Sequence, residues 1–331
     1  MPNVSFSPFD ADDAAGFRNV SIASWNEDVG VRPCPFTFDQ LPLRGSEKLQ
    51  DPSLAFVLLR DDSGEPAGAA RIKVMNRDAP EVATGWLAIE PNARRQGFGQ
   101  RLLQEVEEWA AAQGCTTVTL RHWFSAPTLE STPGWSLATS SGYHLGQHSE
   151  ARIHQLPLAE EIAEACKREQ RIDPNYEVVA WEAPCPDEYV DGLAELRGMF
   201  NDEAPSGHLP VIHQNYDRER LREDEHNHRE QGETSLIAAA IHILSRVVAG
   251  YSEVNVPLDE PALSYQGVTL VRPEHRGHGL GLRLKLANIE NILSSQYPVG
   301  EVLTMNAADN AQMIRVNELL GMRLLDQCPW P

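Results

Sequence analysis

Two similar stretches of the chain constrain the fold more than any other feature. Residues 88–103 read AIEPNARRQGFGQRLL and residues 270–285 read LVRPEHRGHGLGLRLK. They align without gaps at a constant distance of 182 positions, for example from Gly99 to Gly281. Each consists of the end of an apolar strand, a turn rich in arginine and glycine, and the first turns of a helix. The repeat predicts a tandem duplication of one domain.

The composition agrees with two domains and restricts their partners. At 331 residues the chain is long enough for two domains that each bury a core. It has 28 Lys and Arg residues against 48 Asp and Glu residues, a formal net charge of −20. A chain this acidic is a poor general binder of nucleic acid or of anionic membranes. An anionic ligand would therefore need locally concentrated positive charge.

The sequence also bears on the cellular compartment. No stretch approaches the roughly 18 apolar residues that a membrane-spanning helix needs, and no basic and then apolar leader begins the chain. The five cysteines are odd in number and form no CxxC pair. We therefore expect reduced thiols and a cytoplasmic protein. We also expect no metal site, because His226 and His228 fall on different faces of a charged helix.

The order of predicted elements indicates the fold class. In each half a strand and a helix precede a meander of strands, the glycine-rich turn, a helix and another strand. This order predicts an α/β (α+β) fold with a mixed, mostly antiparallel central sheet flanked by helices, rather than an alternating doubly wound sheet. We expect an N-terminal domain over residues 1–157, a linker helix over residues 158–175 and a C-terminal domain over residues 176–331.

The turn of the second stretch has the features of an anion-binding loop. Gly277, Gly279 and Gly281 alternate directly before a helix. Amides without neighbouring Cβ atoms allow a ligand to approach closely, and a helix N-terminus attracts phosphate. Arg276 adds positive charge, so a pyrophosphate is the expected guest. A tight turn without any ligand is the alternative.

Other phosphate-binding and hydrolytic motifs do not fit the chain. A dinucleotide fingerprint counted from Gly277 would need glycine at Leu282, and neither stretch has the Gly-Lys-Ser/Thr of a Walker loop. The hydrolase motifs GxSxG and HExxH are absent from the sequence.

Both turns resemble the motif of a known family. Arg94–Gly99 (RRQGFG) and Arg276–Gly281 (RGHGLG) fit the pattern R-x-x-G-x-G/A, which is similar to the acetyl-CoA pyrophosphate motif of the GNAT superfamily of acyltransferases. Residues 304–322 resemble the strand and helix that follow in this family. The second half as a whole resembles the C-terminal half of actinobacterial tandem GNAT proteins, a group that includes mycothiol synthase-like enzymes. The resemblance covers nearly the whole chain and is strongest over residues 267–322.

The resemblance implies that acetyl-CoA binds at defined positions. Backbone groups at the strand end hold the pantetheine arm and the thioester, loop amides hold the pyrophosphate, and an asparagine after the next strand faces the cofactor. The implied residues of the second half are Leu270, Val271, Arg276, Gly277, His278, Gly279, Leu280, Gly281, Asn306 and Asn310. Their counterparts in the first half are Ala88, Ile89, Arg94, Arg95, Gln96, Gly97, Phe98 and Gly99. A helix N-cap is the alternative role of Asn306.

The resemblance and the strand pattern together suggest catalytic residues. The backbone amide of Val271 is expected to stabilise the oxyanion. Many family members place a tyrosine acid where this chain has Asn317, so water or another group protonates the leaving thiolate, or no acid is needed. Because residues two apart on a regular strand share a face, Tyr265 is expected on the face of Val271, either as a base or as a core aromatic.

The second half is expected to be the catalytic one. Asp202, Glu203 and His208 lie after its first helix, where they either read a cationic acceptor or are merely solvated. The first half lacks the asparagines and has a proline-broken stretch at residues 122–142, so it is expected to be structural or a cofactor site without turnover. We expect a monomer or homodimer that transfers acetyl from acetyl-CoA to an amine of a small molecule. A non-catalytic acyl-CoA-binding or regulatory protein is the alternative.

Overall fold

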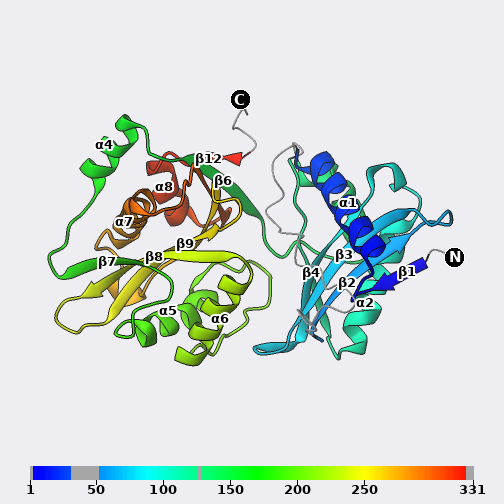
Figure 1. Ribbon diagram of the computed structural model, residues 1–331, viewed down its shortest axis with the longest axis horizontal. Helices are drawn as coiled ribbons and strands as arrows, with labels where there is room; N and C mark the ends of the chain where they lie inside the picture. Colours follow the sequence, from blue (N-terminus) through cyan, green and yellow to red (C-terminus); the bar gives the residue numbers. More distant parts are fainter. Residues whose placement is uncertain (1–2, 31–51, 126–127, 326–331) are drawn as a thin grey trace. The chain divides into compact units, whose positions relative to one another are not determined.

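A computed structural model of the chain describes residues 3–30, 52–125 and 128–325. It divides into two compact units, Met1–Leu145 (unit 1) and Gly146–Pro331 (unit 2), which are described separately below. Each unit has one sheet with helices packed against it (Figure 1). Over the described residues, no helix is both long and apolar enough to cross a membrane.

The sheet of unit 1 has five strands in the order β1-β2-β3-β4-β5. All neighbours are antiparallel except β4 and β5, which run parallel. The strands are β1 (Asn3–Phe6), β2 (Leu54–Arg60), β3 (Pro66–Met75), β4 (Ala79–Ile89) and β5 (Thr117–Leu120). Alternate residues of the central strands are apolar and buried toward opposite faces, so both faces need a covering helix.

Two helices cover the two faces of this sheet. Helix α1 (Ala11–Asp28) packs Phe17 and Val20 against one face, and α2 (Phe98–Ala112) packs Leu102 and Val106 against the other. Short 3₁₀ turns, η2 (Pro91–Ala93) and η3 (Leu129–Ser131), precede α2 and α3 (Pro133–Ser140).

The region around residues 122–142 is less broken than the sequence suggested. Helix α3 forms within it because Pro133 occupies the first helical turn, where its missing N–H costs nothing. The hydroxyl of Thr132 caps this helix by accepting from the amide of Trp135 over 3.2 Å. The expectation of an irregular stretch was therefore wrong for residues 133–140.

The sheet of unit 2 has seven strands in the order β12-β6-β11-β10-β9-β8-β7. Only β10 and β11 are parallel neighbours. The strands are β6 (Ser149–Gln155), β7 (Tyr176–Glu182), β8 (Glu233–His242), β9 (Val248–Pro257), β10 (Leu263–Val271), β11 (Glu301–Ala307) and β12 (Arg323–Leu324). Both sheets are mixed and mostly antiparallel, as the order of elements predicted.

Strand β6 corrects the expected domain boundary. We expected residues up to 157 to complete the N-terminal domain, but β6 pairs with β11 and β12 in the sheet of unit 2. A strand's own sequence shows that it is extended, but the edge it joins depends on residues about 150 positions further along, such as Met305, which pairs with Ala151.

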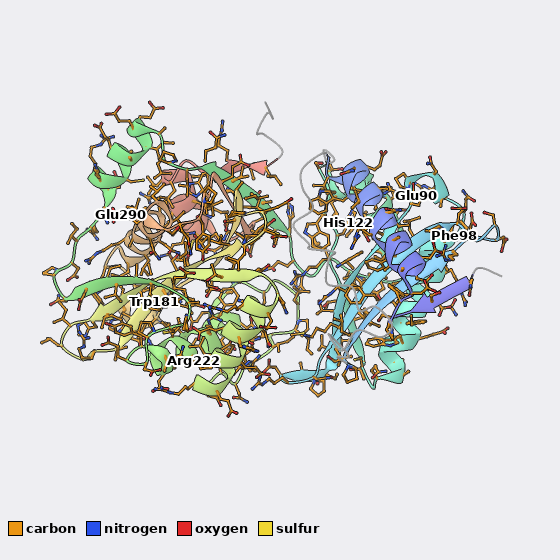
Figure 2. All side chains as sticks on the ribbon, viewed as in Figure 1. Glu90, Phe98, His122, Trp181, Arg222 and Glu290 are labelled. Carbon is orange, nitrogen blue, oxygen red and sulfur yellow. The ribbon has the colours of Figure 1, made fainter. Side chains whose placement is uncertain are left out.

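The helices of unit 2 also cover both faces of its sheet. Leu193 and Leu196 of α5 (Val190–Glu203) and Leu221 of α6 (Arg218–Glu230) pack on one face. Leu282 and Leu284 of α7 (Leu280–Ser294) pack on the other face, which α8 (Ala311–Leu319) and α4 (Glu160–Glu169) also cover. A 3₁₀ turn, η4 (Pro273–His275), leads into α7. Side chains fill the space between sheet and helices in each unit (Figure 2).

Candidate functional site

The two parallel strands of unit 2 separate at their carboxyl ends. Strand β10 pairs with β11 from Leu263 and Glu301 as far as Tyr265 and Leu303. Both strands then continue without pairing to each other, β10 to Val271 and β11 to Ala307. Backbone groups along this opening have no ladder partner across it, so they are available to a ligand.

The arrangement in unit 1 is similar on one side only. The pairing of β4 with β5 ends at Gly85 and Leu120, where β5 itself ends, and β4 continues to Ile89. In both copies of the repeat, the strand before the glycine turn therefore extends beyond its pairing with the parallel neighbour.

Backbone direction in β10 turns specific amides toward the opening. The amide of Arg272 donates to the carbonyl of Ala249 in β9 over 2.9 Å. Because successive amides alternate sides along a strand, the amide of Val271 points away from β9, toward the opening. The amide of Thr269, two residues earlier, points in the same direction. The amide of Val271, the expected donor, thus points toward the opening, and so does the amide of Thr269, which the motif comparison did not indicate.

A β-bulge interrupts β10 and corrects the expected position of Tyr265. The register with β9 shifts between Gln266 and Thr269, so that two residues of β10 oppose one residue of β9. A bulge of this kind breaks the rule that residues two apart share a face. Counting by twos from Val271 to Tyr265 therefore gave the wrong face.

Side-chain contacts show which face each residue of β10 occupies. Gln266 donates to the hydroxyl of Ser252 over 3.2 Å, and Thr269 bonds the same hydroxyl over 3.0 Å, which places both on one face. Val271 packs with residues of α7 on that face, whereas Leu270 packs with α5 and α6. Since Tyr265 precedes Gln266, it lies on the face that α5 and α6 cover.

The glycine turn of unit 2 contains backbone amides that donate no hydrogen bond within the described part of the chain. Gly277 and Gly279 have φ values of 83° and 74°, which favour glycine, and Gly279 is the N-cap of α7. Over the described residues, the amides of Gly277, His278 and Gly279 have no hydrogen-bond acceptor. The first amides of α7, from Leu280 and Gly281, are also without intrahelical partners by position. Five consecutive amides therefore lie at the positive end of a helix, which suits a pyrophosphate.

Unit 1 repeats this turn. Gly97 has a φ value of 89° and is the N-cap of α2, which begins at Phe98 (Figure 2). Arg95 also has a positive φ of 62°, an uncommon value for a residue with a side chain. A Cβ atom at Gly99 would lie 3.1 Å from Leu137, whereas one at Gly281 would meet nothing within 4 Å. At the preceding glycine the comparison is reversed, because a Cβ atom at Gly97 would meet nothing within 4 Å and one at Gly279 would lie 2.8 Å from Arg171. The two turns are therefore open at different positions.

The side chain of Arg276 does not extend into this open space. Its Nε donates to the carbonyl of Val271 over 3.1 Å, and its Nη2 contacts the carboxylate of Glu203 at 2.5 Å. Arg94 makes the equivalent contacts in unit 1, to the carbonyl of Ile89 over 3.3 Å and to Asp28 at 2.8 and 2.9 Å. The loop arginines therefore brace the turn, and the amides provide most of the anion-binding capacity.

His278 is also turned away from the amides. Its Nδ1 lies 2.6 Å from the carboxylate of Asp173, and its ring packs against that of Tyr176. The hydrogen bond from the amide of Asn175, and then the one from His278, hold the pKa of Asp173 below its ordinary value. Only the backbone of His278 is directed at the expected cofactor site.

Three asparagines of the second half that the comparison with the family singled out, Asn306, Asn310 and Asn317, have distinct roles. Asn306 lies inside β11, paired with Glu150, so it is not a helix N-cap. Asn310 is the N-cap of α8, its side chain accepting from the amide of Met313 over 3.1 Å. Asn317 is fully buried and donates from Nδ2 to the side-chain oxygen of Asn306 over 2.6 Å. Asn317 thus holds Asn306 rather than facing a leaving group.

The expected acceptor residues lie at the end of α5 and after it. Asp202 and Glu203 belong to the last turn of this helix, not to the following loop. Asp202 contacts His213 at 2.6 Å, and Glu203 contacts Arg276. His208 is exposed, and its amide donates to the carbonyl of Gly146 over 2.8 Å. Of the three, Glu203 is therefore already paired with the cofactor loop.

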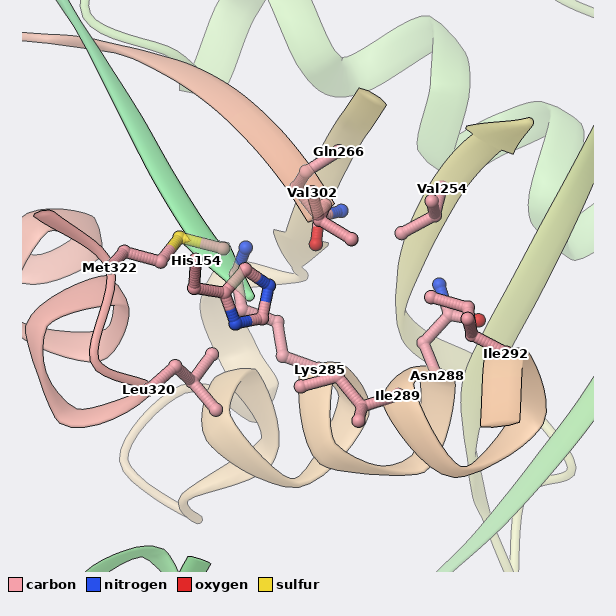
Figure 3. A pocket seen from close by; sticks show the side chains of 10 residues that line it. All are labelled: His154, Val254, Gln266, Lys285, Asn288, Ile289, Ile292, Val302, Leu320 and Met322. Atoms are coloured by element: carbon pink, nitrogen blue, oxygen red, sulfur yellow. The ribbon is translucent and has the colours of Figure 1, made fainter. Parts of the chain in front are cut away.

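Behind β10, a small cavity of about 10 Å³ contains buried polar groups (Figure 3). Its lining includes Lys285 of α7 and His154 of β6, with exposed fractions of 2% and 6%. Burial lowers the pKa of Lys285 to about 7. Burial, and then the charge of Lys285, lower the pKa of His154 to about 4. Over the described residues, neither Nδ1 of His154 nor Oδ1 of Asn288 has a hydrogen-bond partner.

Unit 1 has a larger pocket, of about 50 Å³, beside the end of β4. Tryptophan side chains dominate its wall, from Trp25 of α1, Trp86 of β4 and Trp123 after β5. His122 also lines it, and burial lowers the pKa of this histidine. Within the described ranges, no group of three or more His, Cys, Asp or Glu residues could hold a metal ion in either unit.

Comparison with known proteins indicates what such an arrangement is used for. Residues 21–127 match the model of the "Acetyltransferase (GNAT) family". This match lies in the first half, although the second half has the fuller glycine motif. A mycothiol acetyltransferase from Saccharopolyspora erythraea is 26% identical over 275 residues, covering 81% of this chain and 82% of that protein.

Solved structures have the same two-unit architecture. A tandem GNAT protein from the clavulanic acid biosynthesis pathway matches with a TM-score of 0.71 and 26% identity, over 97% of this chain and 95% of its own. A GCN5-related N-acetyltransferase from Sphaerobacter thermophilus matches with a TM-score of 0.65 and 18% identity, over 97% and 92% of the two chains. The second of these supports the fold alone.

Proposed function

We propose that the chain is a tandem GNAT acetyltransferase that uses acetyl-CoA, and that unit 2 transfers the acetyl group directly to an amine of a small molecule. The observation that carries the proposal is the coincidence, in one unit, of an opening between β10 and β11 and five amides at the start of α7 that have no acceptor among the described residues. Direct attack by the acceptor needs only these elements and a route for the proton.

The backbone of unit 2 supplies the electrostatic part of this reaction. The amides of Gly277 to Gly281 hold the pyrophosphate, and the pantetheine arm follows the opening along β10. The amides of Val271 and Thr269 point into the opening, where they stabilise negative charge that develops on the thioester oxygen. Asn306 of β11 lies on the other side of the same opening.

The acceptor approaches from the face that α5 and α6 cover. Tyr265 lies on that face and relays the proton that the attacking amine loses. The leaving thiolate departs without a dedicated acid, because Asn317 is buried and a thiol with a pKa of about 8.5 is a good leaving group. Asp202 and His208 border the acceptor. The name of the Saccharopolyspora relative supports a small-molecule acceptor.

A non-catalytic acyl-CoA-binding or regulatory protein is the second candidate. Neither unit has a tyrosine at the position of the usual acid, which is Asn317 in unit 2 and Ala138 in unit 1. The two candidates differ in one observable. A binding protein retains acetyl-CoA without consuming it, whereas the acetyltransferase releases free thiol when a suitable amine is present.

The test blocks each glycine turn separately. Gly281→Leu fills open space above the amides of unit 2 without requiring a positive φ. Gly99→Leu is the change at the equivalent position in unit 1, where the new side chain must also displace Leu137. Thiol release from acetyl-CoA is measured against a library of small amines, and thermal melting checks folding. We expect Gly281→Leu to lower kcat/KM for acetyl-CoA about 100-fold or more, equivalent to losing roughly 3 kcal/mol of binding. Activity lost only in Gly99→Leu would reassign catalysis to unit 1, and no thiol release with any amine would favour the binding protein.

A further inference from the structure

The first helix of each unit ends on acidic residues. Helix α1 ends with Asn26-Glu27-Asp28, and α5 ends with Asn201-Asp202-Glu203. Neither helix has a basic residue in its last turn. Negative side chains at a helix C-terminus are unfavourable, because the helix dipole is itself negative there. Each helix end therefore needs a positive charge from elsewhere in its unit.

In both units the arginine of the glycine turn supplies this charge. Arg94 forms a two-pronged ion pair with Asp28, and Arg276 pairs with Glu203. Asp28 and Glu203 are each the last residue of their helix. Each arginine also donates its Nε to the carbonyl of the last residue of the strand before the turn. The same three-part contact therefore occurs twice.

The contact has been retained although the spacing between its partners differs. The arginines are 182 positions apart, as in the rest of the repeat, but the acids Asp28 and Glu203 are 175 positions apart. The chain between acid and arginine is thus seven residues longer in unit 2. Because the contact is present in both units despite this difference in spacing, we take it to be part of the site and not a consequence of the gapless repeat.

The end of α5 connects two parts of unit 2 through three consecutive residues. Glu203 contacts Arg276 of the cofactor loop. Asp202 contacts His213 at 2.6 Å, and the side-chain nitrogen of Asn201 donates to the carbonyl of Ile212 over 2.9 Å. Both of these partners belong to residues 204–217, the segment between α5 and α6. One helical turn therefore joins the cofactor loop to the segment beside the acceptor.

The guanidinium of Arg276 can hold Glu203 and an anion at the same time. Arginine has five N–H donors, of which Nε serves Val271 and one from Nη2 serves Glu203. Its side chain is 41% exposed, so the donors that these two partners do not use remain accessible to an anion. A pyrophosphate bound by that loop would fix the arginine and, through it, the last turn of α5.

We infer that Arg276 and Glu203 couple coenzyme A binding in unit 2 to the order of residues 204–217, so that the cofactor prepares the acceptor side. The inference rests on the proposed function, since it requires the cofactor to bind at the loop 276–281. Arg276 and Glu203 are positioning residues in this account. Arg276 also holds the carbonyl of Val271, so the same contact aligns the residue whose amide faces the thioester.

The test uses coenzyme A as the probe and amide hydrogen exchange of the full chain as the readout. Protection of residues 276–282 reports binding in unit 2, and protection of residues 204–217 reports coupling. We expect coenzyme A to slow exchange in residues 204–217 about fivefold or more in the wild type, within the usual range of coupling between sites. Glu203→Gln should retain protection of the loop but lose protection of residues 204–217, and Glu203→Asp should restore part of it.

A matched control separates coupling from general loosening of the helix. Asp191→Asn removes an ion pair with Arg218 at the opposite end of α5 and should leave the coupling unchanged. Protection of the loop without protection of residues 204–217 in the wild type would overturn the coupling and leave the proposed function intact. Absence of loop protection in the wild type would overturn both. Equal protection of residues 204–217 in Glu203→Gln and wild type would remove Glu203 from the connection.

Discussion

Asn317 of α8 donates a hydrogen bond to the side-chain oxygen of Asn306 in β11 over 2.6 Å, and through it a fully buried residue orients one that borders the opening. The relationship connects the helix after the site to the strand that forms one side of it. It also explains how a position that often provides an acid in similar proteins can serve without a titratable group.

Replacing Asn317 should therefore act through Asn306. We expect Asn317→Leu to lower kcat about tenfold, and Asn306→Ala to do the same, with the double variant no worse than either single one because the residues act as a unit. Steady-state thiol release gives the three values. The alkaline limb of the pH–rate profile should not move in Asn317→Leu, and a change there would indicate that Asn317 takes part in proton transfer after all.

Removing the buried amine of Lys285 should stabilise the protein in a pH-dependent way. Burial lowers the pKa of Lys285 from its ordinary value of 10.5 to about 7 in the fold, so the unfolded chain binds more protons than the native one between these values. Native stability therefore rises with pH across this window. At pH 7 and below, burial of the charged amine lowers the free energy of unfolding by the full amount, a few kcal/mol at about 1.4 kcal/mol per pKa unit.

The measurement is urea unfolding of Lys285→Met and wild type from pH 6 to pH 10. We expect the variant to gain most at pH 6 to 7 and progressively less toward pH 10. His154, the titratable neighbour in the cavity, has a pKa of about 4 and stays neutral throughout this range. A gain that is the same at every pH would mean that Lys285 keeps an ordinary pKa in the fold.

The ion pair between Arg197 and Glu253 should be costly to break. Arg197 of α5 contacts Glu253 of β9 at 2.5 Å, and the side chains are only 11% and 8% exposed. Removing one partner leaves a buried charge without compensation, so Glu253→Gln should lower the free energy of unfolding by about 3 kcal/mol. The exposed pair of Asp191 and Arg218 offers a control on the same helix, and Asp191→Asn should have no measurable effect. Similar losses in both variants would contradict this ranking.

Tyr265 should affect turnover more than cofactor binding. Its hydroxyl is proposed to relay a proton on the acceptor face, so Tyr265→Phe should lower kcat about 100-fold, the usual scale of acid–base assistance, with the KM for acetyl-CoA unchanged. The best acceptor from the amine library serves as substrate, and coenzyme A affinity is measured separately by calorimetry. Unchanged kcat with weakened folding would instead make Tyr265 a core aromatic.

Features that depend on local chain chemistry could be predicted from the sequence. The turns at Gly97 and Gly279 both adopt positive φ and start a helix, as the alternating glycines predicted. The mixed, mostly antiparallel sheets also follow from the succession of elements. The prediction was weaker wherever a side chain had two possible partners. Arg276 was expected to add charge for a pyrophosphate, and its contact with the acid at the end of α5 was not foreseen.

The acidic helix ends were a signal that sequence reasoning missed. Asn-Glu-Asp and Asn-Asp-Glu stand at the ends of the first helices of both units, against the preference for basic residues there. They fall outside the gapless alignment of the repeat, so a comparison at a fixed distance of 182 positions does not find them. An irregular charge at a helix end, rather than a motif, would have indicated a partner for each loop arginine.

The sequence by itself determined that this protein is a tandem repeat with a glycine-rich turn before a helix in each copy, because a positive φ, a helix start and an apolar strand are encoded within about 15 consecutive residues. Only the tertiary structure decided which sheet β6 joins, on which face Tyr265 lies and where Arg276 points. Each of these outcomes depends on strand register or on an ion pair between residues far apart in the chain. A single extra residue at the bulge in β10 reverses the face of everything before it, and no local pattern fixes that register.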